Sequence, residues 1–224
     1  MTSNNPKTTL MKTVFAHIAF LTIAIISFSF NNSEPDCREV FEAVKENNID
    51  KVKSLLAANG NCVNATNLDG ETPLYMAVSE NHTEMVKALL NFKPLTEKSE
   101  NRGLTPLHKA CINGNYDIAL MLINAGANVN AESSIGYTCL MYAADENLKF
   151  VSLLVDKGAK LNATGPMGET ALMEAARHGS LENVKYLISK GADHKLQDSE
   201  GKTAADIAAD NNHPEIAEFL RGLE

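Results

Sequence analysis

Small and apolar residues recur at a constant interval along residues 36–224. The most regular marker is a glycine, and the steps from one to the next are 33, 33, 32 and 33 residues: Gly70, Gly103, Gly136, Gly168 and Gly201. An alanine follows seven residues after each of them: Ala77, Ala110, Ala143, Ala175 and Ala208. A leucine stands three residues before the alanine in most units, and residues three apart share one face of a helix. The interval therefore predicts repeated units that bury narrow apolar stripes against one another.

Each unit carries signals for the start and the end of a helix. A threonine stands two residues after each glycine and can cap a helix start, and two of these threonines precede proline: Thr72, Thr105, Thr138, Thr170 and Thr203. Eleven residues after each glycine comes a residue type that tolerates the left-handed conformation of a helix end: Asn81, Gly114, Asn147, Gly179 and Asn212. A second apolar segment follows, so each unit predicts two helices joined by a tight turn.

The segment "TPLHKA" at Thr105–Ala110 is the most specific part of this pattern. It resembles the ankyrin repeat, and the resemblance covers about six units: 36–69, 70–102, 103–135, 136–167, 168–200 and 201–224. The resemblance implies an all-α solenoid of helix-turn-helix units with β-hairpin fingers and terminal units that act as caps. It also implies a concave binding face formed by the fingers and the first helix of each unit.

Two units depart from the repeat. The fourth lacks one residue, and the gap falls just before Leu148, where we expect a loop to absorb it. The second ends in "NFKPLTE", with Lys93 in place of a glycine. We therefore expect a distorted finger between the second and third units.

The first thirty residues have a different composition. Lys7 and Lys12 precede an apolar run over residues 14–30, no acidic residue is present, and small residues stand at the exit of the run. This pattern predicts a cleaved secretory signal over 1–30 followed by a short linker at 31–35. An uncleaved membrane anchor over 14–30 and a buried core helix are the alternatives.

The charge balance narrows the class of partner. The chain carries 20 basic and 28 acidic residues, and removal of Lys7 and Lys12 with the signal would change the net charge from −8 to −10. Such an acidic chain is not expected to bind nucleic acid or anionic membrane surfaces, but it leaves open a protein partner with a basic face. With the short signal, this balance favours a resemblance to bacterial periplasmic or secreted ankyrin-repeat proteins.

His108 and Cys111 are the strongest candidates for chemistry, because an imidazole and a thiol three residues apart share a helix face. The equivalent positions of the other units hold residues as different as Tyr75 and Met141, which no shared catalytic base would allow. We interpret the pair as scaffold, and the resemblance implies that this histidine braces a finger. The sequence predicts no cofactor, no metal site and no enzyme; a catalytic function would require a deep polar pocket with clustered titratable groups.

The cysteines fall into two pairs. Cys37 stands at the entry to the first helix of the first unit and Cys62 lies beyond its second helix, so antiparallel helices would bring them together. A disulfide and two unpaired thiols both remain open for this pair. Cys111 and Cys139 lie five residues out of phase in adjacent units, so we expect no bond between them.

The resemblance also places the partner-binding residues. We expect an apolar anchor cluster of Leu104, Ile112, Ile135, Tyr137 and Met167. An acidic rim would consist of Glu132, Asp145, Glu146 and Glu169, and Arg177 lies in a further contact position. The alternative is that some of these side chains pack sideways on neighbouring fingers and only stabilise the stack.

Overall fold

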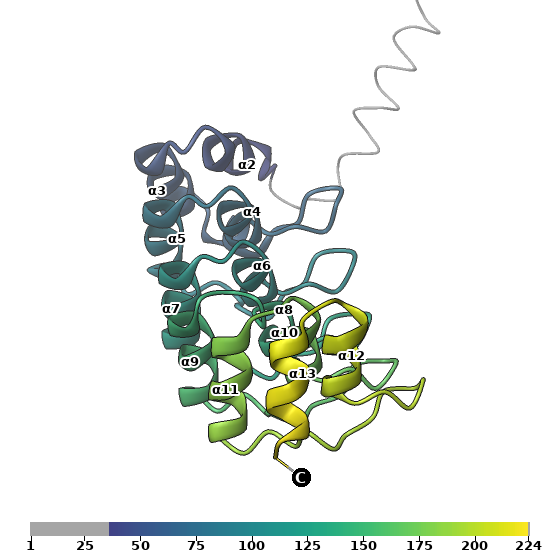
Figure 1. The fold of residues 1–224 in the computed structure, drawn as a ribbon. Helices are drawn as coiled ribbons and strands as arrows, with labels where there is room; N and C mark the ends of the chain where they lie inside the picture. The colour runs from purple at the N-terminus through teal and green to yellow at the C-terminus, as the bar shows by residue number, and fades with distance from the viewer. Residues whose placement is uncertain (1–35, 224) are drawn as a thin grey trace, which may run out of the picture. The chain divides into compact units, whose positions relative to one another are not determined.

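The computed structural model describes residues 36–223, which form a stack of six helix pairs (Figure 1). The first helices of the pairs are α2 (Arg38–Lys45), α4 (Pro73–Ser79), α6 (Pro106–Ile112), α8 (Cys139–Tyr142), α10 (Ala171–Arg177) and α12 (Ala204–Asp210). The second helices are α3 (Ile49–Ala58), α5 (Thr83–Leu90), α7 (Tyr116–Asn124), α9 (Leu148–Asp156), α11 (Leu181–Ser189) and α13 (Pro214–Arg221). A short 3-10 helix, η1 (Gly60–Asn64), follows α3. The all-α ankyrin solenoid expected from the sequence is confirmed.

In the second to sixth units the first helix begins directly after the threonine, as the sequence predicted. Each threonine side chain accepts a hydrogen bond from the backbone N–H three residues later, as Thr72 does from Tyr75 and Thr170 from Met173. The threonine has an extended backbone, and its hydroxyl satisfies one of the free N–H groups of the first turn.

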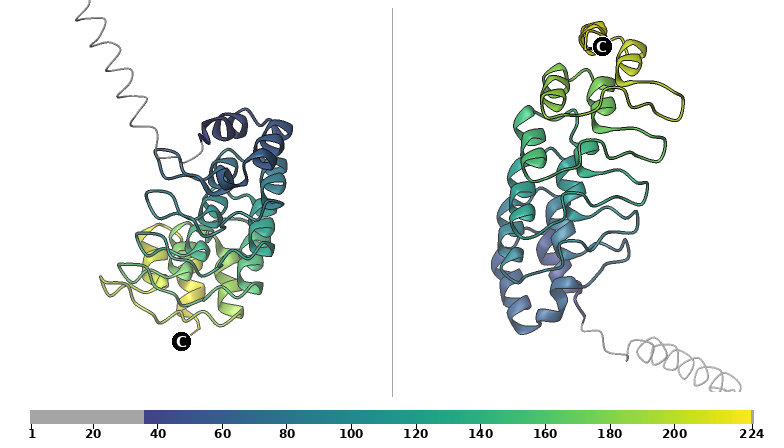
Figure 2. Two further views of the ribbon diagram at one scale, coloured as in Figure 1. Left: turned by 180° about the vertical axis from the view of Figure 1, so that it is seen from behind. Right: turned by 90° about the horizontal axis from the view of Figure 1, so that it is seen from below.

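Alanines let the helix pairs approach closely. The first helices form one row and the second helices another, while the fingers project together from one side of the stack (Figure 2). The alanine of each first helix has no exposed surface: Ala43, Ala77, Ala110, Ala143, Ala175 and Ala208. Leucine side chains such as Leu107 and Leu172 are buried beside them. A continuous core therefore runs along the stack, and no unit could bury its apolar face alone.

The fingers are hairpin-shaped turns that are too short to form strands. Within residues 36–223 the β pairing is one isolated bridge between Glu132 and Thr138, so the expected β-hairpins are reduced to turns. In this finger the Ser133 N–H donates to the Tyr137 carbonyl at 2.9 Å, and Gly136 adopts φ 77°. The marker glycines thus lie in turns, as the repeat requires.

Lys93 does not distort the following finger, so that prediction was wrong. Its φ of 53° places it in the left-handed region, where Gly126, Gly158 and Gly191 serve the other units. The finger then closes with a hydrogen bond of 3.1 Å from the Glu100 N–H to the Leu104 carbonyl. The backbone geometry is kept, with a non-glycine residue in the left-handed conformation.

The turn of the fourth unit differs from the sequence prediction. Asn81, Gly114, Gly179 and Asn212 have positive φ as expected, but Asn147 has φ −61° and caps the start of α9 instead. The missing residue removes the left-handed position itself. α8 is correspondingly only four residues long, whereas α10 has seven.

A disulfide closes the first unit. Cys37 and Cys62 are bonded with a Cα–Cα separation of 5.3 Å, which decides between the two states that the sequence left open. On the chain-entropy argument, closing such a loop stabilises the terminal repeat by about 3.5 kcal/mol. Within residues 36–223 this unit packs against one neighbouring repeat, so the cross-link acts where stacking is weakest.

The signal, the linker and the alternative anchor all fall on residues outside the part of the chain that the structure describes. Within residues 36–223, no helix is long and apolar enough to cross a bilayer.

Candidate partner-binding face

Three of the five predicted anchor residues are exposed on the side formed by the fingers and the first helices. Ile135 and Met167 lie at the tips of the fingers before α8 and α10, with 57% and 54% of their surface exposed. Ile112 ends α6 and is 42% exposed. Large apolar side chains left in water on one side of a molecule favour a contact surface.

Leu104 and Tyr137 are half-buried, so they contribute less surface than expected. The Tyr137 hydroxyl lies 3.2 Å from Glu169 Oε1 and 3.4 Å from Glu174 Oε1, and it donates to these carboxylates. Burial, followed by the negative charges of Glu174 and Glu169, raises the pKa of Tyr137. The phenol therefore remains a neutral hydrogen-bond donor at physiological pH.

Glu169 is not part of an exposed acidic rim, which corrects the sequence prediction. Only 8% of its surface is exposed, and its Oε2 accepts the Met167 N–H at 2.9 Å. The carboxylate thus ties the fingertip that carries Met167 to the Tyr137 hydroxyl. A surface role was assigned to a side chain that packs against the neighbouring finger, as the alternative interpretation allowed.

The remaining predicted residues are at least partly accessible. Glu132 and Asp145 are exposed, whereas Glu146 is half-buried, and burial and the charge of Asp145 raise its pKa. Arg177 lies beside Glu174, with 3.5 Å between Nε and Oε2, and keeps 40% of its side chain exposed. The acidic residues are thus spread along the face instead of forming one continuous rim.

A pocket of about 460 Å³ opens between the last fingers and the helices α10 and α12. Its wall consists of Tyr137, Met167, Glu169, Glu174, Arg177, Asp198, Ser199, Glu200, Lys202, Ile207, Asp210 and Asn211. Four of these were predicted as binding residues. The predicted binding residues did not include the sixth unit, although Asp210 occupies the same position after its glycine as Asp145 and Arg177 do in theirs. The repeat register was therefore the signal that could have found it.

In the fourth unit, aromatic side chains occupy the equivalent part of this face. The rings of His108 and Tyr142 lie 5.8 Å apart, and those of Tyr142 and Tyr137 lie 5.5 Å apart. Six residues after the marker glycine, Tyr142 is replaced by Glu174 and Ile207 in the next two units. These smaller side chains leave the space that becomes the pocket.

His108 is part of the scaffold, as the sequence analysis proposed. It is buried, its Nδ1 accepts the Thr105 N–H at 3.2 Å, and its Nε2 lies 3.0 Å from the Ala131 carbonyl oxygen. The two bonds together require a neutral ring with the proton on Nε2, which donates to Ala131. The histidine thus braces the start of the following finger.

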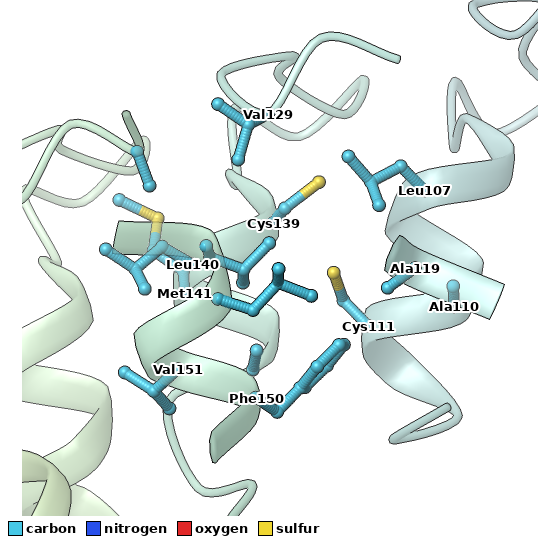
Figure 3. Close-up of a cluster of buried hydrophobic side chains, with 14 of the residues drawn as sticks. Leu107, Ala110, Cys111, Ala119, Val129, Cys139, Leu140, Met141, Phe150 and Val151 are labelled. Carbon is cyan, nitrogen blue, oxygen red and sulfur yellow. The ribbon is translucent and has the colours of Figure 1, made fainter. Parts of the chain in front are cut away.

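Cys111 and Cys139 are both free and buried, so the expectation that no disulfide joins them is confirmed. Their side chains lie within the core that Figure 3 shows around Leu140 and Phe150. Burial raises the pKa of Cys111 well above its ordinary value, so this thiol stays protonated. In residues 36–223, no group of three metal-ligating side chains gathers.

Comparison with known proteins agrees with this geometry. A family model described as "Ankyrin repeats (3 copies)" matches residues 40–133 and 140–223. This chain belongs to the ankyrin-repeat family. The boundary between the two matches falls in the finger that leads to α8, the shortened helix of the stack.

Three animal proteins with different names and lengths are among the relatives. The chain is 31% identical over 188 residues, 84% of its length, to a transient receptor potential cation channel subfamily A member 1 homolog of Caenorhabditis elegans. It is 33% identical over 119 residues, 51% of its length, to the mouse ankyrin repeat and SAM domain-containing protein 6. It is 35% identical over 95 residues, 41% of its length, to the human Notch-regulated ankyrin repeat-containing protein.

Only the repeats are shared with these proteins. The chain spans 16% of the channel homolog and 14% of the mouse protein, but 83% of the human protein. Ankyrin repeats are protein-interaction modules, and this family is typically non-catalytic. The resemblance to bacterial exported proteins rests on the sequence pattern alone.

Proposed function

We propose that this chain is a non-catalytic, exported module that binds a partner protein on the face formed by its fingers and first helices. The observation that carries the proposal is the exposure of Ile112, Ile135 and Met167 on that face. Removing such side chains from water on binding is favourable by about 25 cal/mol per Å². Ile135 and Met167 occupy the same position in adjacent fingers, so one partner surface could cover both.

Export is supported by two features of the chain. The apolar run over residues 14–30 has the composition of a secretory signal. The Cys37–Cys62 disulfide suits an oxidising compartment such as the periplasm or the extracellular space. If the run stays uncleaved, the chain is instead a membrane-tethered scaffold. N-terminal sequencing of the protein from its host distinguishes the two, because only the cleaved form starts after residue 30.

The binding face can be tested with the double variant Ile135→Ser/Met167→Ser. Both side chains are more than half exposed, so the free energy of unfolding should change by less than about 1 kcal/mol. Capture of a partner from the native compartment should weaken at least about tenfold, as for loss of an apolar anchor. Leu95→Ser is the matched control, because Leu95 is 58% exposed in the segment between α5 and its finger, away from the binding face.

The melting temperature separates a loss of contact from a loss of fold. Equal capture by the wild-type protein and the double variant would contradict the proposal. So would a loss of capture that Leu95→Ser reproduces.

A further inference from the structure

The pocket in the last three units suggests which chemical group the partner presents. Building on the proposed function, we infer that this pocket receives an arginine side chain of the partner protein. The inference depends on three properties of the pocket: its charge, its apolar wall and the way its own groups are already bonded.

The wall of the pocket is strongly negative. It contains five carboxylates, from Glu169, Glu174, Asp198, Glu200 and Asp210, and two cations, which leaves a net charge of −3. A concave surface of low dielectric concentrates such a field and attracts a positive group. The same field repels phosphate, carboxylate and nucleic acid, so an acidic ligand is excluded.

The two resident cations do not neutralise the pocket. Lys202 Nζ lies 3.0 Å from both Glu200 and Asp210, and Arg177 pairs with Glu174 at 3.5 Å. Both pairs are at least partly open to water, since Asp210 keeps 55% and Arg177 keeps 40% of the side chain exposed. Exposed carboxylates can accept further hydrogen bonds, because each has about four acceptor sites.

The apolar part of the wall suits arginine better than a small cation. Met167 stands at the rim, the Tyr137 ring forms one side, and Ile207 lies buried below. An arginine side chain packs its methylene stem on such groups and keeps its planar head for carboxylates, which it binds in pairs. The adjoining apolar tips of Met167 and Ile135 would then hold the partner around the anchored side chain.

The charge in the pocket can be tested with short peptides. The 15N-labelled full-length chain is titrated with Ac-Gly-Arg-Gly-NH2 and with the citrulline analogue, which has the same shape but no charge. The arginine peptide should shift the amide signals of Glu174, Lys202 and Asp210 in a saturable manner at millimolar concentration. The citrulline peptide should leave them in place. Equal shifts from both peptides or no saturable shift would overturn the inference. So would tighter binding of Ac-Gly-Lys-Gly-NH2, titrated in the same way.

Substitutions locate the site. Asp210→Asn, on the exposed end of α12, should weaken arginine-peptide binding at least fivefold, and Glu174→Gln should do so as well. Asp156→Asn is the matched control, because it removes one exposed carboxylate from α9, outside the pocket. Peptide affinity that is unchanged in Asp210→Asn, whose fold the same spectra report, would contradict the assignment.

The two proposals fail separately. If a partner is captured through Ile135 and Met167 but no arginine peptide binds, the binding face stands and the pocket assignment is wrong. If the arginine peptide binds but the Ile135→Ser/Met167→Ser variant captures the partner normally, the pocket assignment stands and the proposed face is wrong.

Discussion

The turn between the two helices has a different backbone geometry in the fourth and fifth units. In the fifth unit, Gly179 adopts φ 79° and the Ser180 N–H donates to the Ala175 carbonyl at 2.9 Å, which closes the end of α10. Four other units have the same bond between equivalent positions, such as His82 to Ala77. The fourth unit is one residue shorter and lacks it; the Glu146 N–H instead bonds to the Ala143 carbonyl at 3.0 Å.

The fifth unit repairs the turn of the fourth. Asn183 in α11 donates its side-chain amide to the Ala144 carbonyl at 3.0 Å and to the Glu146 carbonyl at 2.6 Å. The second, third, fourth and sixth units carry large apolar residues at this position: Met85, Ile118, Phe150 and Ile216. A repeat stack can therefore accept a deletion when a neighbouring unit supplies the lost hydrogen bonds. The cost is a buried polar side chain whose Oδ1 has no partner.

The largest effect is expected for Asn183→Ile, which restores the apolar residue of the other units. It leaves the carbonyls of Ala144 and Glu146 without their donor, so it should reduce the free energy of unfolding by about 2 kcal/mol. Urea denaturation measures the change. The same substitution at exposed Asn124, at the end of α7, should cost less than about 0.5 kcal/mol. A gain of stability in Asn183→Ile would mean that the repair is not needed.

Gly179→Ala tests the intact turn. The new methyl group would lie 2.5 Å from His213 Cε1, and the backbone would stay at a φ that disfavours side chains. We expect a loss of about 1.5 kcal/mol in thermal or urea unfolding. Asn147→Gly, eleven residues after the marker glycine of the fourth unit, should give no gain, because Asn147 has negative φ and caps α9. A gain there would show that the fourth turn does sample the left-handed state.

Restoring the missing residue should make the repair redundant. A glycine inserted between Glu146 and Asn147 returns the unit to 33 residues and supplies the left-handed position. In the Asn183→Ile background it should recover about 1 kcal/mol of unfolding free energy, more than it adds to the wild type. Additive effects in this double-mutant cycle would contradict the compensation.

The smallest effect is expected for Lys93, a non-glycine residue in a left-handed backbone conformation. Lys93→Gly relieves a positive φ of 53° and should stabilise the protein by about 0.5 kcal/mol. Lys190→Gly, at a helix end with φ −91°, should instead destabilise it. Parallel melting curves of the two variants check the difference in sign.

Most of the fold could be predicted from the sequence, because its signals are local and repeated. The glycines, the capping threonines and the buried alanines were each found where expected, since helix starts and turns depend on a few adjacent residues. Asn147 was misassigned because the deletion changed the geometry around an unchanged residue type. The role of Asn183 could not be predicted, since its partners lie 37 and 39 residues away.

The binding face was predicted less completely, for a physical reason. The repeat register shows which positions lie on the face, but neighbouring side chains decide which of them stay exposed. Glu169 is buried because Tyr137, one unit earlier, offers it a hydrogen bond. The pocket exists because Glu174 and Ile207 are smaller than Tyr142 at the equivalent position. Both facts depend on contacts between neighbouring units, which the residue pattern within one unit does not contain.

The most direct test of the account is a photo-crosslinking measurement with the captured partner. Benzoylphenylalanine is placed at Ile135, on a fingertip, or at Glu182, an exposed position of α11 in the row of second helices. If the fingers and first helices bind the partner, illumination should cross-link it to the Ile135 variant and not to the Glu182 variant. Cross-linking only from Glu182, or equally from both positions, would contradict the proposed face.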